Sequence, residues 1–209
     1  MINTKKLNIL KHAIAVIAQR GFDGASTREI ARAAGVSQGM LNYYFGSKER
    51  ILEEAIAIYQ HHVQDIFKEI EKGKLSPEDQ LREVCFRLID LGMENADLLK
   101  LVKIEQFLGV REELYTKATV TSDMVLKELN SIVNQGIQQE VFKPRVEPTI
   151  FVPSLYSMVM MYILSEEQIY TFFKRKSQKP IQVNKFKDFI SKMLKENLLP
   201  ITQGELSLV

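Results

Sequence analysis

The chain has 209 residues, of which 45% are hydrophobic and 26% are charged. These fractions are those of an ordinary globular protein, so the composition excludes a largely disordered chain. A single cysteine, Cys85, excludes an internal disulfide framework, and no apolar run reaches the roughly 18 residues that a membrane span needs. Because no signal-peptide pattern is present either, we expect a cytoplasmic protein that does not associate with membranes.

The net charge of +2 is unevenly distributed along the sequence. Residues 1–50 contain eight basic and three acidic side chains, a net charge of +5, whereas the remaining residues carry −3. Electrostatic attraction of one end of a protein to a polyanion such as DNA requires a basic region of this kind. A difference of this size also arises by chance, so the charge alone does not identify a nucleic-acid-binding protein.

The first quarter of the chain predicts three short helices. Apolar residues at helical spacing define the first, which ends at Gly21. Ser26 and Glu29 have the spacing of a capping box, so a second helix begins there. Gly35 permits a tight turn, and Ser37 is placed to cap a third helix of about two turns. Two capped helices joined by a tight glycine turn have the form of a helix-turn-helix.

The remainder also predicts helices, because strand alternation and hairpin turns are missing. The expected helices cover residues 48–71, 77–93, 97–108, 111–139, 148–173 and 184–198. Pro153 either kinks the helix that starts at Pro148 or marks its true beginning. The expected fold class is all-α with about nine helices. We expect a helix-turn-helix domain over residues 1–47 and a larger helical domain over residues 48–209.

The third helix, in the stretch SQGMLNYYF, is unusually polar for so short an element. At about 100° per residue, Leu41 and Phe45 fall on the side that faces the expected core. The opposite half contains Gln38, Gly39, Asn42 and Tyr43, with Met40 and Tyr44 at its edges. Amide groups bond base edges, tyrosines contact phosphates, sugars or thymine methyl groups, and a glycine lets the backbone approach the groove.

Residues beside this helix fit contacts to the DNA backbone. Thr27 and Arg28 open the second helix, and Lys48 adds a positive charge at the N-terminus of the fourth. We include Ser37, the cap of the third helix, among the expected DNA-binding residues. Two alternatives stay open: an ordinary helical hairpin with a solvated polar face, and a helical scaffold that binds no DNA.

The motif STREIARAAGVSQGMLNYYFGSKERIL, residues 26–52, resembles the DNA-binding signature of the tetracycline-repressor (TetR) family. Residues 9–26, ILKHAIAVIAQRGFDGAS, are similar to the first helix and Gly-Phe turn of that family. The resemblance implies that the third helix enters the major groove of double-stranded DNA, with phosphate contacts from Thr27, Arg28 and Lys48. Met40 stands where the family often has threonine, and Asn42 where tyrosine is common, so the operator sequence does not follow.

The resemblance also implies a homodimer that binds a palindromic operator, with half-sites about 34–36 Å apart. We expect the dimer interface on the last two long helices, residues 148–173 and 184–198. Their apolar residues, which could instead complete the core, are Leu155, Val159, Tyr162, Ile163, Phe186, Phe189, Ile190, Met193 and Leu194. The KRKSQK stretch between them is expected to be a solvated connector, with a second nucleic-acid contact as the alternative.

A small-molecule effector is implied for the larger domain. Candidate residues of its pocket, each of which could also be ordinary core, are Phe86, Ile89, Met93, Phe107, Tyr115, Met124 and Tyr156. Methionine and aromatic side chains suit an adaptable apolar pocket, so we expect an apolar or aromatic ligand. Binding of this ligand would displace the helix of residues 48–71 and release a repressor from its operator. An activator remains the alternative.

No feature of the sequence predicts an enzyme. A nucleophile elbow, a P-loop and a dinucleotide-binding glycine motif are all missing, so we expect no catalytic residue and no cofactor. His61 and His62 are adjacent and point to different sides of a helix, and Cys85 has no partner at metal-ligand spacing. We interpret Cys85 as a small buried apolar residue, with a redox or covalent-ligand role as the alternative.

Overall fold

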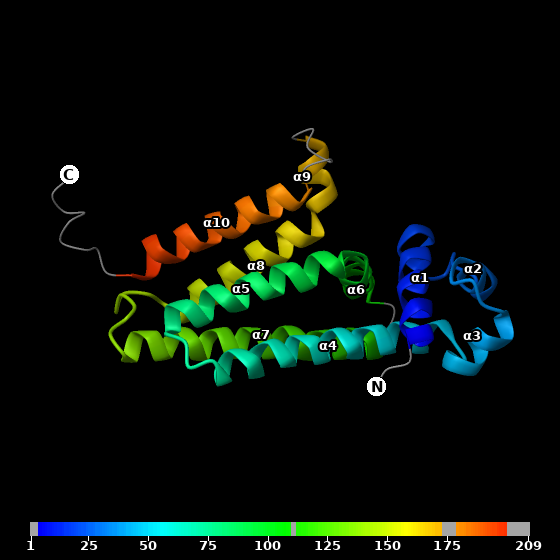
Figure 1. Ribbon diagram of the computed structural model, residues 1–209, viewed down its shortest axis with the longest axis horizontal. Helices are drawn as coiled ribbons and strands as arrows, with labels where there is room; N and C mark the ends of the chain where they lie inside the picture. The colour runs from blue at the N-terminus through cyan, green and yellow to red at the C-terminus, as the bar shows by residue number, and fades with distance from the viewer. Residues whose placement is uncertain (1–3, 110–111, 173–178, 200–209) are drawn as a thin grey trace. The chain divides into compact units, whose positions relative to one another are not determined.

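The computed structural model describes residues 4–109, 112–172 and 179–199, which contain ten α-helices and no strand (Figure 1). The helices are α1 (Thr4–Arg20), α2 (Thr27–Ala33), α3 (Gln38–Phe45), α4 (Lys48–Lys72), α5 (Pro77–Glu94), α6 (Ala96–Leu108), α7 (Glu112–Gln138), α8 (Pro148–Leu164), α9 (Glu166–Phe172) and α10 (Lys179–Leu198). The all-α prediction is confirmed. The KRKSQK stretch, residues 174–179, lies outside the described residues except for Lys179, where α10 begins.

Serine side chains set the starts of several helices. The Ser47 hydroxyl accepts a hydrogen bond from the backbone N–H of Arg50 at 3.2 Å, one turn into α4. Ser76 does the same for the N–H of Asp79 at 3.2 Å, and Pro77 follows as the first residue of α5. These bonds satisfy backbone donors that have no partner within the helix.

The single helix expected over residues 148–173 is wrong, because the chain bends by 69° between α8 and α9. Ser165 closes α8 by donating its N–H to the carbonyl of Met161 at 3.0 Å. Its own carbonyl then accepts from the N–H of Ile169 at 3.0 Å, which starts α9. The Ser165 hydroxyl also bonds the Met161 sulfur at 3.2 Å. A small polar residue that bonds locally therefore replaces the continuous helix.

The structure also fixes the starts of α8 and α10, which the sequence left open or placed differently. Pro153 lies inside α8, which begins at Pro148, so it does not mark the start of that helix. The last helix begins at Lys179 rather than at residue 184. Among the described residues, no single helix has the length and hydropathy to cross a bilayer, and the bent pair α8–α9 meets that criterion only when taken together.

Chain contacts divide the protein into two compact units. Unit 1 consists of Met1–His62 and Asn95–Ser122, and unit 2 of Val63–Glu94 and Asp123–Val209. Within unit 1, α1 packs on both α2 and α6. Its core combines the following buried side chains: Ile9, Leu10, Ala13, Ile14, Ile17, Phe22, Ala25, Ile30, Ala31, Ala34, Leu41, Phe45, Ile51, Leu52, Ala55, Ile56, Leu98 and Leu101. The contribution of α6 through Leu98 and Leu101 was not predicted.

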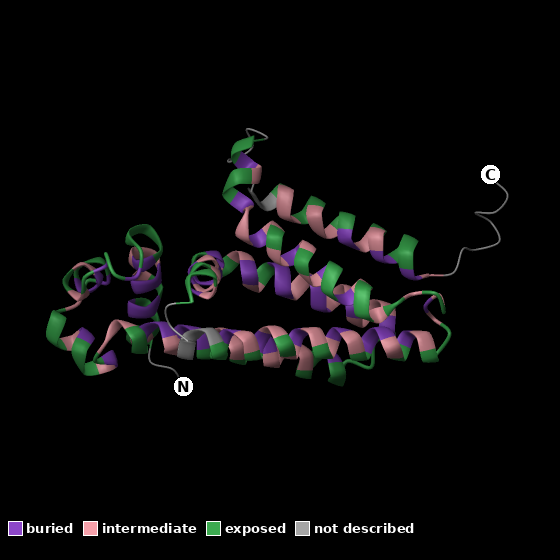
Figure 2. Cartoon of the chain, turned by 180° about the vertical axis from the view of Figure 1, so that it is seen from behind, coloured by how far each residue is buried: buried purple, intermediate pink, exposed green. Residues whose placement is uncertain are grey.

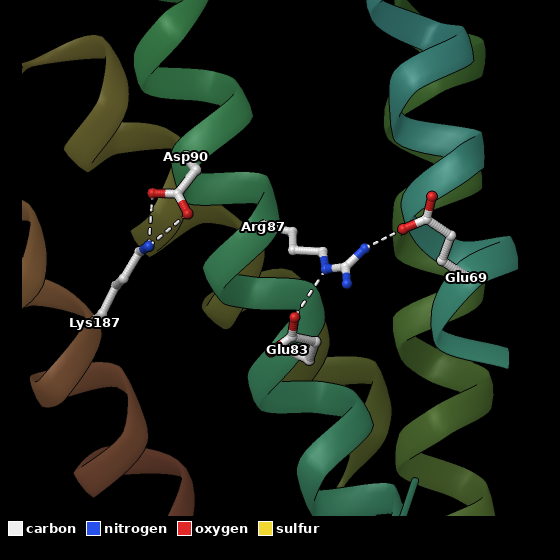
Figure 3. Close-up of polar contacts among 5 residues, drawn as sticks. All are labelled: Glu69, Glu83, Arg87, Asp90 and Lys187. Atoms are coloured by element: carbon white, nitrogen blue, oxygen red, sulfur yellow. Dashed lines mark hydrogen bonds and ion pairs between the residues drawn. The ribbon is translucent and has the colours of Figure 1, made fainter. Parts of the chain in front are cut away.

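In unit 2, α5 packs against α8 and α10 (Figure 1). Charged side chains also connect α5 to its neighbours (Figure 3). The Arg87 guanidinium donates to Glu83 on its own helix and to Glu69 on α4. The Lys187 ammonium of α10 donates to both carboxylate oxygens of Asp90 at 2.6 Å. The hydrogen bond to Glu83 and, to a smaller extent, that to Glu69 raise the pKa of Arg87. Pairs this exposed each contribute at most about 1 kcal/mol, so buried apolar packing holds the unit together.

Candidate DNA-binding site

The second helix is fixed at its start by the predicted capping box. The backbone N–H of Glu29 donates to the Ser26 hydroxyl at 3.2 Å, and the Ser26 N–H donates to the Glu29 carboxylate at 3.1 Å. The Ser26 hydroxyl also donates to the Glu29 carboxylate at 2.8 Å. The bonds that this carboxylate accepts, first from the Ser26 backbone N–H and then from its hydroxyl, lower the pKa of Glu29. The start of α2 therefore has one defined geometry, and Thr27 and Arg28 lie within its first turn.

The turn between α2 and α3 depends on Gly35. Its φ of +66° lies in the left-handed region that side chains other than glycine rarely adopt. The N–H of Val36 then reaches back to the carbonyl of Ala31 at 3.0 Å, and the Ser37 hydroxyl caps α3 by accepting from the N–H of Met40 at 3.1 Å. The helix-turn-helix geometry thus follows from local residues, as predicted.

The two faces of α3 differ as the helical wheel predicted. Leu41 and Phe45 are buried in the core of unit 1. The exposed residues of the helix are Gln38, Gly39, Asn42 and Tyr43, while Met40 and Tyr44 are partly buried at the edges. Figure 2 colours the helices by the burial of their residues. Tyr43 is 85% exposed, and its ring meets that of Tyr44 edge-on at 5.5 Å between centroids. The amide side chains of Gln38 and Asn42 and the Tyr43 ring are therefore on a surface that is able to enter a DNA groove.

Most of the predicted backbone-contacting residues are available at this surface. Arg28 and Ser37 are exposed, and Thr27 is partly exposed. The Gln38 side-chain amide donates to the Thr27 hydroxyl at 3.2 Å, which ties the start of α3 to the start of α2. Lys48 differs, because its ammonium turns inward to the carbonyl oxygens of Phe22 and Ala25.

Comparisons with known proteins agree with this geometry. Residues 9–55 match the family model described as bacterial regulatory proteins, tetR family, and residues 77–194 match the tetracyclin repressor-like C-terminal domain. The chain belongs to the tetR family of bacterial regulatory proteins. This tetR-family chain is a DNA-binding transcriptional regulator, and α3 is the second helix of its helix-turn-helix.

Among its relatives, the transcriptional regulator PksA of Bacillus subtilis is 24% identical over 145 residues, which is 69% of either chain. The structure of the ketosteroid transcriptional regulator KstR2 of Mycobacterium tuberculosis superposes with a TM-score of 0.79 at 15% identity, covering 96% of this chain and 98% of that one. FadR of Bacillus subtilis, solved in complex with stearoyl-CoA, gives a TM-score of 0.63 at 20% identity, covering 88% and 97%. The two solved regulators share its fold.

The seven expected effector residues do not gather at one described cavity. Phe107 is 90% exposed on α6 and lines none of the described cavities. Ile89 is fully buried in unit 2, and Phe86 lies beneath the Lys187 ammonium, 5.4 Å from its ring centroid. Met93 and Tyr156 are partly buried in unit 2. The side chain of Tyr115 lies outside the described residues.

One cavity of unit 2, of about 660 Å³, does include the remaining candidate, Met124. It lies among α4, the turn that follows it, α5 and α7, and its apolar lining is Phe67, Ile70, Leu75, Met124 and Ile132. Its polar lining is Gln64, Lys68, Glu71, Lys74, Gln80, Glu128, Ser131 and Gln135. The missed residues follow a pattern visible in the sequence: positions 124, 128, 131 and 135 lie on one face of a helix.

The expected dimer surface also needs correction. Five of its nine residues are buried within unit 2 and offer no surface to a partner: Leu155, Val159, Ile163, Ile190 and Leu194. Tyr162 and Phe186 stack on one another, with ring centroids 3.8 Å apart, and Met193 is partly buried. Phe189 stays exposed, and α8 and α10 expose other large apolar side chains that the sequence did not single out: Ile150, Met161 and Ile181.

Proposed function

We propose that this regulator reads a palindromic DNA operator with α3 as a homodimer. The observation that carries the proposal is the exposed polar face of a helix whose opposite face is fixed in the core of unit 1. Asn42 is suited to a bidentate contact with adenine, and Gln38 to another base edge. Tyr43, with most of its surface in solvent, contacts a phosphate, a sugar or a thymine methyl group.

The homodimer forms through α8 and α10. One recognition helix covers few bases, and a two-fold dimer doubles the contact on half-sites about one helical turn apart. Ile150 and Met161 of α8 and Phe189 of α10 are each more than half exposed, an apolar surface that a second copy would cover. Functionally, we assign residues 1–47 to DNA binding and residues 48–209 to effector binding and dimerisation. A regulator of this kind acts in the cytoplasm.

The effector site is the cavity among α4, α5 and α7. Its volume lies in the range of small-molecule sites, roughly 300–1,000 Å³. Its mixed lining favours a ligand with an apolar body and a polar head over a purely apolar one. Two similar proteins support this class, since KstR2 is named for ketosteroids and FadR was solved with stearoyl-CoA.

The effector releases a repressor by moving α4. This helix runs from Lys48 to Lys72, carries residues of both compact units, and contributes Phe67 and Ile70 to the cavity. A displaced α4 changes the separation of the two recognition helices and so their fit to the operator. Shifting the equilibrium from 1:99 to 99:1 requires the ligand to prefer one state by about 5.5 kcal/mol.

A titration of labelled operator tests the DNA-reading surface. Gln38→Ala should weaken operator binding by about 1–3 kcal/mol, the value of a good base contact, and leave the free energy of unfolding nearly unchanged. The matched control is Gln19→Ala, which removes the same amide from an exposed position on α1. Equal operator affinity of the two variants would exclude the assigned role of this face.

A release assay tests the effector site. The preformed operator complex is titrated with a long-chain acyl-CoA and, separately, with a sterol ketone, and the free DNA is measured. Release that Ser131→Trp abolishes, because the indole fills the cavity, is the expected result for at least one probe. Release that is unaffected by Ser131→Trp would place the effector elsewhere.

A further inference from the structure

The side chain of Lys48 is partly buried, and its ammonium group turns toward the backbone of unit 1. Its Nζ donates to the carbonyl oxygen of Phe22 at 2.6 Å and to that of Ala25 at 2.8 Å. It also lies 4.8 Å from the centroid of the Phe22 ring, within cation–π distance. Lys48 therefore fastens the first residue of α4 to the turn between α1 and α2.

The two carbonyl groups that Lys48 bonds belong to buried residues. Phe22 and Ala25 are both buried, and a buried carbonyl without a hydrogen bond is costly. Generic electrostatics do not explain the position of Lys48, because a cation at a helix N-terminus is disfavoured by the helix dipole. The specific bonds to the turn offset that penalty, and they use two of the three N–H donors of the ammonium.

A short path of bonds leads from this turn to the recognition helix. Ala25 immediately precedes Ser26, the N-cap that fixes the start of α2. The next residue, Thr27, accepts the hydrogen bond from the Gln38 side chain at 3.2 Å. A shift of the turn would therefore move the start of α2 and the contact that orients Gln38 on α3.

We propose that Lys48 is a positioning residue for operator specificity, which acts by holding the α1–α2 turn and not by contacting a phosphate. The proposal rests on the proposed function of α3 as the reader of the operator. It replaces the expectation from the sequence, in which Lys48 anchors the DNA backbone. The two roles differ in a measurable way, because only a phosphate contact releases counterions on binding.

Lys48→Met tests the difference, because it removes the ammonium and keeps an apolar stem beside the Phe22 ring. The matched control is Arg28→Met, which removes an exposed cation from the first turn of α2. Each protein is titrated with the selected operator and with a scrambled duplex at several salt concentrations. The slope of log K against log[salt] and the ratio of the two affinities are the readouts.

For Lys48→Met we expect the affinity ratio to fall at least tenfold with no change in the salt slope. For Arg28→Met we expect the slope to fall by about 0.9, the value of one phosphate contact, with the ratio nearly unchanged. A slope reduced by about 0.9 in Lys48→Met would overturn the proposal, and so would an unchanged ratio. A purely structural loss lowers the folded fraction and weakens both duplexes equally, so it leaves the ratio unchanged.

A measurement on the unaltered protein covers the case in which Lys48→Met does not fold. Nitrogen-15 NMR of the lysine side chains should show that the Lys48 ammonium exchanges its protons slowly with water, in free and DNA-bound protein alike. Assignment of Lys48 to the fast-exchanging group, or a coupling of its Nζ to phosphorus in the complex, contradicts the proposal. If the unaltered protein selects no operator, the proposed function of α3 fails instead, and the two failures are distinct.

Discussion

Gly136 of α7 lies where any side chain would collide with Phe142. A Cβ atom built on this glycine would lie 2.8 Å from Cγ of the Phe142 ring and closer still to Cδ2 and Cε2, against the 3.5–4.0 Å of ordinary contact. The ring cannot slide away easily, because the N–H groups of Val141 and Phe142 both bond the Gly136 carbonyl, at 2.9 and 3.0 Å. Phe142 is also among the most buried side chains of unit 2.

Gly136→Ala should therefore destabilise the protein although alanine is the better helix former. Displacing a buried phenylalanine costs about 3–5 kcal/mol at most, and the helix propensity of alanine returns about 1 kcal/mol. The expected loss in the free energy of unfolding is about 2–4 kcal/mol, or a fall in Tm of about 4–16 °C for a chain of this size. Urea denaturation followed by circular dichroism, at one fixed protein concentration, measures it.

Gly39→Ala is the matched control. This helical glycine is exposed, and a Cβ would meet only the Ser37 hydroxyl oxygen, at 3.9 Å. The same substitution should stabilise the protein there, by up to about 1 kcal/mol. In the double variant Gly136→Ala/Phe142→Leu the losses should be less than additive, because the smaller side chain relieves the collision. Unchanged or increased stability of Gly136→Ala would refute the reasoning.

Three further predictions follow from single side chains. Burial raises the pKa of the Cys85 thiol from 9.0 to about 12, so alkylation at pH 8 should be at least about a hundredfold slower in the folded protein than in urea, and comparable rates would contradict this. The pKa of Glu29 is lowered, so its stabilising effect is present above pH 4.5 and is lost as the pH falls through the pKa of the folded state. The difference in stability between the unaltered protein and Glu29→Gln should therefore shrink from pH 6 to pH 3. A constant difference would exclude the capping box as its origin. Asp90→Asn should cost no more than about 1 kcal/mol in urea denaturation, because the Asp90 carboxylate is mostly exposed, and a loss above about 2 kcal/mol would show that its pair with Lys187 is a major support of unit 2.

Features that depend on neighbouring residues could be predicted from the sequence. The Ser26–Glu29 capping box, the turn at Gly35 and the two faces of α3 each involve positions within a few residues, and local spacing determines them. The resemblance of residues 26–52 to a known DNA-binding signature, now supported by a family model over residues 9–55, gave the same helix-turn-helix.

Features that depend on residues distant in the chain could not be predicted from the sequence. The acceptors of Lys48 lie 26 and 23 residues earlier in the chain, so its charge alone suggested a phosphate contact. Phe107 was chosen by residue type, whereas its exposure depends on how α6 packs in unit 1. The break at Ser165 lies in an apolar, helix-favouring stretch, where a local hydroxyl bond ends the helix without any proline or glycine signal.

Selection of operator sequences from random duplex DNA, at two salt concentrations, tests the central claim most directly. The unaltered protein is compared with a variant that combines Gln38→Ala, Asn42→Ala and Tyr43→Phe, all on the exposed face of α3. We expect enrichment of a palindrome whose half-sites are about one helical turn apart, lost in the variant, with affinity that falls steeply as salt increases. No enriched sequence, or the same palindrome from both proteins, would contradict the assignment of α3 as the reader of the operator.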